Sequence, residues 1–195
     1  PGQFIHLKCG EDKNFILRRP FSIHRIAGGS FELLFQVVGK GTAWLSRVKP
    51  HTGLDILGPI GRGFMMLEDL KTALIVAGGI GIAPLFFLAD ELIRQRTKLF
   101  TVMGAFDKDQ LFYYMDLKRI SYKISVATED GSFGIKGTVA DLIPEILETA
   151  KIQQIYACGP RTMLQKVAEI SASHQVPCQV SLDERMGCGI GACLA

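Results

Sequence analysis

The sequence predicts a β barrel followed by an α/β domain, with a short cysteine-bearing tail at the end. Up to about residue 68, short β-rich runs are separated by turns without long helices, which is typical of a small antiparallel barrel. From about Lys71, apolar runs alternate with helical stretches, which predicts βαβ units and a doubly wound parallel sheet. The 195 residues, 48% of them hydrophobic, are enough to build real cores.

In the first part, strands are expected where β-forming residues lie between turn residues. Gly28-Gly29, between the second and third runs, is a hairpin signal. One short helical segment is expected near Thr42–Val48. The expected strands are Gln3–Cys9, Phe15–Ile26, Ser30–Val38 and Leu54–Pro59.

In the second part, Thr72–Ala77 is a continuous apolar run, as expected of a strand that is buried on both faces. The further expected strands are Lys98–Gly104, Tyr122–Ala127, Gln154–Cys158 and Cys178–Leu182. The helices between them are expected at Pro84–Gln95, Gln110–Arg119, Val139–Leu147 and Thr162–His174. We therefore divide the chain into a barrel (1–68), an α/β domain (69–176) and a tail (177–195).

Composition excludes several classes of partner. The 22 basic and 19 acidic residues give a net charge of only +3, too mild to indicate nucleic acid or a membrane surface. No uninterrupted apolar run reaches the roughly 18 residues that span a bilayer. An odd number of cysteines, five, without a signal peptide argues against a disulfide framework, so a cytoplasmic protein is expected.

The first candidate binding element is the strand segment Arg18–Ile23, RRPFSI. Pro20 gives no ladder hydrogen bond and marks an edge or bulge, which can present its neighbours to a ligand. The planar fork of Arg19 suits a diphosphate, and the hydroxyl of Ser22 suits a ring nitrogen such as that of a flavin. The alternative is an edge strand that carries surface arginines.

The second candidate element is the turn Val38–Thr42, VGKGT, which leads into the helical segment. Gly39 and Gly41 allow a close approach of the backbone. A helix N-terminus capped by Thr42 would favour phosphate oxygens. Read alone, the turn is equally an ordinary loop and cap.

A glycine-rich turn, Gly78-Gly79-Ile80-Gly81-Ile82-Ala83-Pro84, joins the first parallel strand to its helix. Such a turn places dinucleotide phosphates on backbone N–H groups and on the helix dipole. The alternative is a tight crossover with Pro84 in the first helical turn.

Cys158-Gly159-Pro160, followed by Met163, comes after a later strand, at the sheet edge where open α/β sheets place their ligands. Cys158 is therefore a candidate for lining the reaction site. The alternative is that this cysteine is a small buried hydrophobe.

Two polar loops bear on the choice of nucleotide. Asp107 follows the second parallel strand, where a carboxylate accepts hydrogen bonds from ribose hydroxyls and repels a 2′-phosphate. This favours NAD over NADP, although the neighbouring Lys108 weakens the argument. Glu129-Asp130-Gly131 follows the third strand and is either a loop beside the nicotinamide or simply an Asp-Gly turn.

The tail carries Cys188 and Cys193 as a C-x₄-C pair on a glycine-rich loop. Plant-type [2Fe–2S] proteins use C-x₄-C-x₂-C with a distant fourth cysteine. A third ligand would fall directly after Ala195, and we expect residues to be missing at both ends. The alternative is two free thiols on a flexible tail.

The two barrel elements together resemble the ferredoxin–NADP reductase superfamily, which binds FAD through an Arg-x-[Tyr/Phe]-Ser strand and a later Gly-x-x-[Ser/Thr] turn. The GGIGIAP turn and the Cys-Gly-Pro element resemble its NAD(P) domain. The resemblance implies that Arg19 and Thr42 hold the FAD pyrophosphate, that Ser22 lies near the flavin N5, and that Cys158 approaches the nicotinamide. It further implies contacts with the flavin or ribityl chain from Phe21, Phe35, Gln36, Val37 and Val38.

Over its whole length, and most closely at Val180–Cys193, the chain resembles the electron-transfer subunits of class 1B dihydroorotate dehydrogenase. That resemblance implies a partner subunit that oxidises dihydroorotate on its own FMN, within a heterotetramer of pyrimidine biosynthesis. Electrons would pass through the [2Fe–2S] cluster and FAD to NAD⁺. Two alternatives stay open: the small subunit of an NADH-dependent ferredoxin:NADP oxidoreductase or sulfide dehydrogenase, and a non-catalytic flavin or thiol redox sensor.

Overall fold

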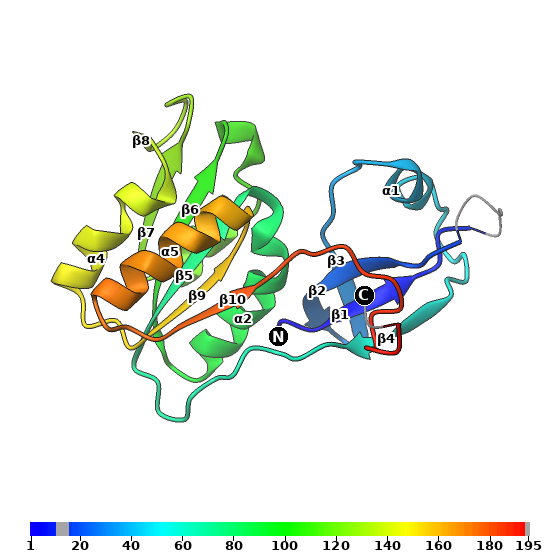
Figure 1. Cartoon of the computed structure of the whole chain (residues 1–195), viewed down its shortest axis with the longest axis horizontal. Coiled ribbons are helices and arrows are strands. Elements are labelled where there is room, and N and C mark those ends of the chain that lie inside the picture. The colour runs from blue at the N-terminus through cyan, green and yellow to red at the C-terminus, as the bar shows by residue number, and fades with distance from the viewer. Residues whose placement is uncertain (11–15, 194–195) are drawn as a thin grey trace.

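The computed structural model describes residues 1–10 and 16–193, which form two sheets side by side (Figure 1). The first is a four-stranded sheet with the order β3-β2-β1-β4, and its paired strands are antiparallel. The second is a six-stranded parallel sheet with the order β10-β9-β5-β6-β7-β8. The predicted succession of an antiparallel and a parallel sheet is confirmed.

The antiparallel sheet contains the predicted hairpin. Ala27 pairs with Ser30, and the two glycines between them have φ values of 57° and 80°, which side chains with a Cβ rarely adopt. A core forms on one face from Ile5, Leu7, Phe21 and Ile23 with Cys9. The elements of this part are β1 (Phe4–Leu7), β2 (Arg19–Ala27), β3 (Ser30–Leu33), α1 (Lys40–Leu45) and β4 (Ile56–Ile60).

Two predicted boundaries in this part need correction. The strand expected at Ser30–Val38 ends at Leu33, and residues 34–38 form no strand. The strand expected from Phe15 begins at Arg19, with Phe15 itself outside the described residues. Pro20 lies where β2 is paired with β1 alone, because the pairing with β3 starts only at Ile23. It therefore costs no ladder hydrogen bond on the open side.

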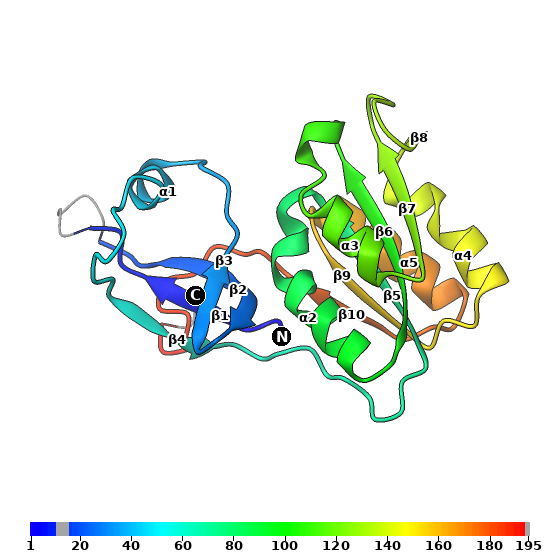
Figure 2. The ribbon, with the colours of Figure 1, turned by 180° about the vertical axis from the view of Figure 1, so that it is seen from behind.

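The parallel sheet is built around β5, which is buried along almost its whole length. Successive side chains of a strand point to opposite faces. Ala73, Ile75 and Ala77 accordingly pack in one core, and Leu74 and Val76 in the other. Helices α4 and α5 cover the face seen in Figure 1, and α2 and α3 cover the face seen in Figure 2.

The elements of this part run as follows. They are β5 (Thr72–Gly78), α2 (Ile82–Arg94), β6 (Lys98–Ala105), α3 (Tyr114–Ile120), β7 (Lys123–Thr128), β8 (Ile135–Lys136), α4 (Ile143–Thr149), β9 (Gln154–Cys158), α5 (Arg161–Ser173) and β10 (Cys178–Ser181), with 3₁₀ turns η1 (Gly79–Gly81), η2 (Lys108–Gln110) and η3 (Val139–Asp141).

Two predicted helices are shorter than expected. The helix expected at Gln110–Arg119 begins only at Tyr114, because Tyr113 has a left-handed φ of 58°. The segment expected as one helix over Val139–Leu147 is a 3₁₀ turn and then α4, with Pro144 in the first turn of α4. Proline suits the first helical turn, where no N–H is needed, and disrupts a helix interior.

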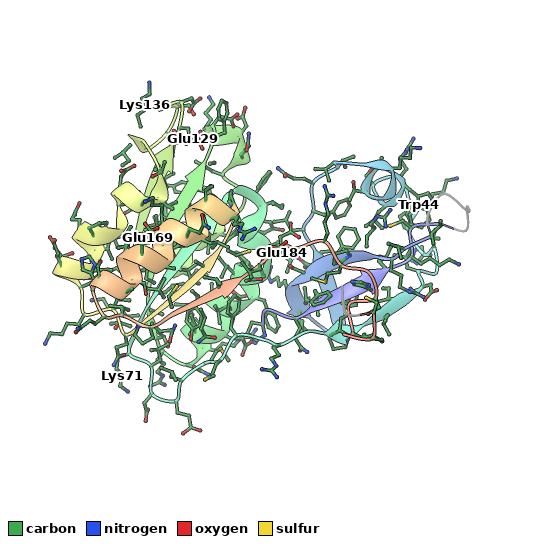
Figure 3. All side chains as sticks on the ribbon, in the orientation of Figure 1. Trp44, Lys71, Glu129, Lys136, Glu169 and Glu184 are labelled. Atoms are coloured by element: carbon green, nitrogen blue, oxygen red, sulfur yellow. The ribbon has the colours of Figure 1, made fainter. Side chains whose placement is uncertain are left out.

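After β10 the chain crosses back to the antiparallel sheet, as the red segment of Figure 1 shows. Glu184, labelled in Figure 3, lies in this crossing segment. The segment ends in the cysteine loop, where Gly189 lies against the ring of His6 on β1. Among the described residues, no helix is long and apolar enough to cross a membrane.

Candidate functional site

A cleft of about 1020 Å³ lies between the two sheets. Its walls come from β2 and the loop after β3 on one side, and from the carboxyl ends of β5, β6, β9 and β10 on the other. In the parallel sheet, β6, β7 and β8 lie on one side of β5, whereas β9 and β10 lie on the other. Open α/β sheets bind ligands at such a switch point.

The cleft brings together most of the residues that the sequence singled out. The predicted residues that line it are Pro20, Phe21, Ser22, Phe35, Gln36, Val38, Thr42, Gly78, Gly79, Gly81, Ala83, Pro84, Glu129, Cys158, Gly159, Pro160 and Met163. The predicted residues that do not line it are Arg19, Val37, Gly39, Gly41, Asp107, Asp130, Gly131, Cys188 and Cys193.

On the antiparallel side, Phe21 and Phe35 meet edge to face with ring centroids 5.4 Å apart. Phe21 is buried, and the neighbouring Ser22 is half-buried at the cleft wall. No other group among the described residues hydrogen-bonds the Ser22 hydroxyl, so it is available to a ligand. This wall thus offers aromatic surface and one free hydroxyl.

The turn before α1 differs from the expectation in one respect. Gly39, and not Thr42, is the N-cap of α1. The Oγ1 atom of Thr42 accepts hydrogen bonds from the N–H groups of Val38 (3.0 Å) and Gly39 (3.1 Å). Arg19 approaches the same turn, since a Cβ on Gly41 would lie 3.3 Å from its Cγ. Arg19 and the turn are therefore neighbours.

The glycine turn opposite is tightly packed on one side and open on the other. A Cβ on Gly78 would lie 2.6 Å from Sδ of Met163, and one on Gly81 would lie 2.2 Å from the carbonyl oxygen of Cys158. By contrast, nothing lies within 4 Å of a Cβ on Gly79, whose φ is 51°. The glycines thus bring β5 and β9 together and leave open space at the cleft.

Cys158 ends β9 and is buried at the wall of the cleft. Burial raises the pKa of its thiol to about 11, against a smaller lowering by a hydrogen bond with Ser181. The thiol is therefore protonated at neutral pH and is not a thiolate nucleophile. A neutral thiol suits a residue that lines a reaction site.

The two polar loops make local hydrogen bonds. Asp107 caps η2, with its Oδ1 accepting from the N–H groups of Asp109 (2.9 Å) and Gln110 (3.2 Å). Asp130 accepts from the hydroxyl and N–H of Ser132, and these bonds lower the pKa of its carboxyl. Of the predicted residues in these loops, only Glu129 lines the cleft, although Phe106 and Gln110 of the first loop line it as well.

Several cleft residues were not anticipated. The segment after β10 contributes Leu182, Asp183 and Met186, and the first turn of α5 contributes Arg161 and Thr162. Phe106 follows β6 and is exposed in the cleft. Their common signal is position, because each follows the carboxyl end of a parallel strand. Open α/β sheets bind ligands beyond the carboxyl ends of their strands, and applying this rule to every predicted strand would have identified these residues from the sequence.

The cysteine loop brings its two thiols together outside the cleft. The N–H of Cys188 donates to Sγ of Cys193, and the N–H of Cys193 donates to Sγ of Cys188, both at 3.4 Å. Hydrogen bonds from the backbone of Ile190 and from Cys193 lower the pKa of the Cys188 thiol to about 6. No group of three or more His, Cys, Asp or Glu side chains suited to a metal occurs among residues 1–10 and 16–193.

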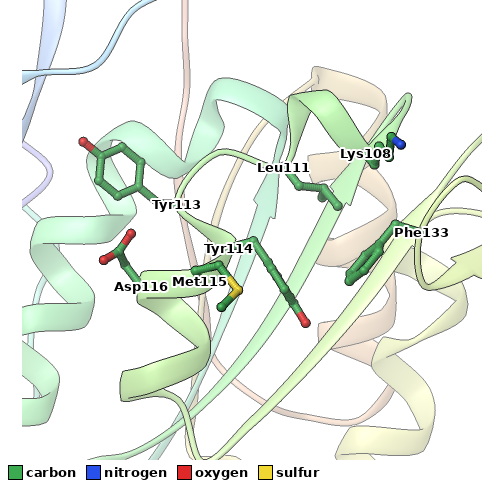
Figure 4. A pocket seen from close by; sticks show the side chains of 7 residues that line it. All are labelled: Lys108, Leu111, Tyr113, Tyr114, Met115, Asp116 and Phe133. Atoms are coloured by element: carbon green, nitrogen blue, oxygen red, sulfur yellow. The ribbon is translucent and has the colours of Figure 1, made fainter.

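A second, smaller cleft of about 330 Å³ lies beside α3, and Figure 4 shows its side chains. It is lined by Lys108, Leu111, Tyr113, Tyr114, Met115, Asp116 and Phe133. The rings of Tyr114 and Phe133 meet edge to face with centroids 5.1 Å apart. None of the predicted site residues lines it, so we place the candidate site in the larger cleft.

Comparison with known proteins agrees with this geometry. The family model described as an oxidoreductase NAD-binding domain matches residues 75–169. The chain is 43% identical over 197 residues to the dihydroorotate dehydrogenase B (NAD⁺) electron transfer subunit of Desulforamulus reducens, covering all of this chain and 75% of that protein. The chain belongs to the family of dihydroorotate dehydrogenase B electron transfer subunits. The resemblance seen in the sequence is thereby confirmed, and the chain is an oxidoreductase subunit.

Other relatives place this electron transfer subunit among ferredoxin reductase-like proteins. The subunit of Caldanaerobacter subterraneus subsp. tengcongensis is 42% identical over all of this chain and 74% of its own length. A solved structure of an NADH-dependent reduced ferredoxin-NADP oxidoreductase is 32% identical, with a TM-score of 0.86, over 99% of this chain and 69% of that one. The ferredoxin reductase of carbazole 1,9a-dioxygenase, 21% identical with a TM-score of 0.75 over 93% of this chain and 59% of that one, shares the fold.

Proposed function

We propose that the chain carries electrons from a dihydroorotate-oxidising partner subunit to NAD⁺, with FAD and NAD⁺ meeting in the cleft and a [2Fe–2S] cluster at the cysteine loop. The observation that carries the proposal is the cleft itself. It unites Ser22 on β2 with the glycine turn after β5 and with Cys158 on β9. The family and the NAD-binding domain model support the same reading.

The residues present fit both dinucleotides. The cleft's volume of about 1020 Å³ is at the upper end of the ~300–1,000 Å³ range of small-molecule sites. On one wall, the Phe21 and Phe35 rings offer an apolar surface and Ser22 offers a free hydroxyl. On the other, the space above Gly79 lets a phosphate approach backbone N–H groups at the start of α2.

The cysteine loop fits half of a cluster site. Thiolates are the ligands of [2Fe–2S] clusters, and the hydrogen bonds around Cys188 favour its thiolate form. Gly189 and Gly191 have φ values of 71° and 80°, which shape a loop whose N–H groups turn toward sulfur. Cys188 and Cys193 would supply two of the four ligands.

The roles of individual residues are those that the family resemblance implies, and of these residues Ser22, Thr42 and Cys158 line the cleft. When bound, flavin exchanges hydride with nicotinamide and single electrons with a cluster. Arg19 and Thr42 would hold the FAD pyrophosphate, and Ser22 would hydrogen-bond the flavin ring. Asp107 would select NAD through the ribose hydroxyls. Cys158, a neutral thiol, would exclude water between the two rings and exchange no proton.

Spectroscopy with an activity assay tests the proposal. The full-length protein is purified and its absorbance spectrum recorded, and NADH oxidation is then measured with an artificial dye as electron acceptor. We expect flavin absorbance, released FAD on denaturation, and NADH-dependent dye reduction. Absence of both flavin and NADH oxidation would contradict the proposal and leave the redox-sensor reading in its place.

The partner is tested separately. Co-expression with the dihydroorotate dehydrogenase catalytic subunit of the same organism should yield a heterotetramer that contains FMN as well as FAD and reduces NAD⁺ with dihydroorotate. A second candidate function is supported by the structural match to the NADH-dependent ferredoxin-NADP oxidoreductase. Reduction of ferredoxin in place of electron uptake from dihydroorotate would select it.

A further inference from the structure

His24 forms a direct hydrogen bond between the two halves of the molecule. It lies on β2 with only 1% of its surface exposed, and its Nδ1 is 3.0 Å from the carbonyl oxygen of Ala83 in the first turn of α2. A carbonyl oxygen only accepts, so Nδ1 carries the hydrogen and donates. The bond joins the antiparallel sheet to the helix that follows the glycine turn.

The surroundings of the ring hold it in one orientation. Its centroid lies 5.0 Å from that of Phe86 on α2 and 4.4 Å from that of Tyr113, the residue before α3. Phe86 and Tyr113 also contact each other, with centroids 4.9 Å apart. Next to this group, Arg25 pairs with Asp90 of α2 at 3.6 Å. The imidazole therefore packs against both aromatic rings in a cluster of three, and its donor atom is aimed at one acceptor.

The chemistry of the ring shows what a histidine adds at this position. The Nε2 atom is buried and has no hydrogen-bond partner in the part of the chain that the structure describes. Leaving a buried polar atom unpaired costs free energy that an apolar ring would not cost. Packing alone would therefore favour phenylalanine here. The property that histidine contributes is the directional bond to Ala83.

The bond links His24, which lies on β2 close to the cleft, with Ala83, which lines it. Ser22 lies two positions before His24 on β2, and the pairing of β2 with β3 has a register irregularity at His24, between Ile23 and Arg25. Ala83 itself lines the cleft, and it comes two positions after Gly81, which contacts the backbone of Cys158. A short path thus runs along β2 from Ser22 to His24, across the hydrogen bond to Ala83, and on to Gly81 and Cys158.

We propose that His24 is a positioning residue that sets the separation of the two cleft walls through its hydrogen bond to Ala83. The inference rests on the proposed function, since hydride transfer requires the flavin-side and nicotinamide-side walls at a fixed spacing. Small displacements of reacting groups slow such steps steeply, by as much as about a hundredfold for 1 Å. His24 does not line the cleft and would act through Ala83, which does.

Three substitutions separate the bond from the packing. His24→Asn keeps an N–H donor at the Nδ1 position, His24→Gln moves it to about the Nε2 position, and His24→Leu removes it. Each variant of the full-length flavoprotein is mixed with NADH in a stopped-flow instrument. We expect His24→Asn to reduce its flavin within about threefold of the wild-type rate, and His24→Gln and His24→Leu to be slower by about tenfold or more.

Two further readouts distinguish positioning from general stability. The long-wavelength charge-transfer absorbance of the flavin–nicotinamide complex should weaken in His24→Gln and stay in His24→Asn, because it reports ring stacking. Amide hydrogen exchange in residues 80–83 should be faster in His24→Gln and unchanged in His24→Asn. Arg25→Gln, which removes the neighbouring ion pair, is the control and should reduce its flavin at the wild-type rate.

The outcomes are distinct. Equal rates in His24→Gln and His24→Asn would overturn the positioning role, even if His24→Leu failed to fold. A wild-type protein that does not oxidise NADH would contradict the proposed function. In that case faster exchange in His24→Gln would still support the link to Ala83, and unchanged exchange would overturn it.

Discussion

Gly81 lies directly against the backbone of Cys158, and a Cβ placed on Gly81 would come within 2.2 Å of the Cys158 carbonyl oxygen and 2.7 Å of the Gly159 nitrogen. The first turn of α2 therefore rests on the end of β9, the strand beside β5. Because the obstacle is backbone, no rotation of a side chain relieves it. The packing of the turn against β9 therefore requires glycine at position 81, whether or not a ligand is bound.

Gly81→Ala is expected to destabilise the fold by about 1–3 kcal/mol, the usual cost of overpacking a rigid site. It should also raise the KM for NADH, because the turn must move away from Cys158. Urea unfolding and steady-state kinetics check the two effects. Gly53→Ala is the control, since a Cβ there meets nothing within 4 Å, and its effect should stay within about 0.5 kcal/mol.

Ser22→Ala should slow the reduction of the flavin by NADH by about threefold to tenfold, the worth of one hydrogen bond of ~1 kcal/mol. Thermal stability should change little, because no other described group bonds the Ser22 hydroxyl. Ser30→Ala on the same sheet removes a turn hydroxyl that donates to the carbonyl oxygen of Ala27, outside the cleft lining, and should leave the rate unchanged. Unaltered reduction kinetics in Ser22→Ala would remove Ser22 from the site.

Asp107→Ser should weaken the use of NADH more than that of NADPH. Serine is a good N-cap, so η2 should persist while the negative charge is removed. The measurement is the ratio of kcat/KM for the two nucleotides. Asp109→Asn, which removes a charge two positions away, should leave that ratio unchanged. An equal loss for NADH and NADPH in Asp107→Ser would contradict the ribose role.

Folding stability should fall as the pH is lowered from about 7 toward 5. Burial lowers the pKa of His24 below its usual value of about 6.5, so the unfolded chain binds a proton that the folded chain does not. Stability therefore rises with pH across this window. Glu32 and Asp90 favour the charged ring, Arg25 opposes it, and the Ala83 carbonyl favours it. His24→Asn should reduce the pH dependence of the free energy of unfolding, measured by urea unfolding at several pH values. An unchanged pH dependence would show that another group causes it.

Gly189→Ala should displace the cysteine loop, since a Cβ there would lie 2.6 Å from Cε1 and Nε2 of the buried His6 ring. Gly191→Ala is a matched control, because Gly191 has a similar positive φ but meets nothing within 4 Å. Iron content and visible absorbance of the full-length protein are the measurements. We expect a lower cluster content in Gly189→Ala than in Gly191→Ala, and equal contents would show that contact with His6 does not place the loop.

Local patterns predicted much of the fold. The strand Gln154–Cys158 has the predicted bounds. All five of its residues are buried, so the limits of the strand coincide with the limits of the buried run in the sequence. The Gly28-Gly29 hairpin follows from backbone sterics within two residues. β8 was not predicted, since its two exposed residues, Ile135 and Lys136, show no periodic pattern. It forms only because β7 leaves an edge to pair with.

The sequence by itself determined the two sheets, the glycine turn and the cysteine pair, because these depend on side-chain periodicity and on residues that few other types replace. The tertiary structure decided which of them meet. Ser22 and Cys158 are 136 positions apart and share a cleft, while Thr42 turns its hydroxyl back to its own loop. His6 and His24 have no distinguishing pattern in the sequence. In the structure both are buried, His6 against the cysteine loop and His24 against the first turn of α2. Such contacts follow from how two sheets dock, and docking depends on all the packed surfaces at once and on no single motif.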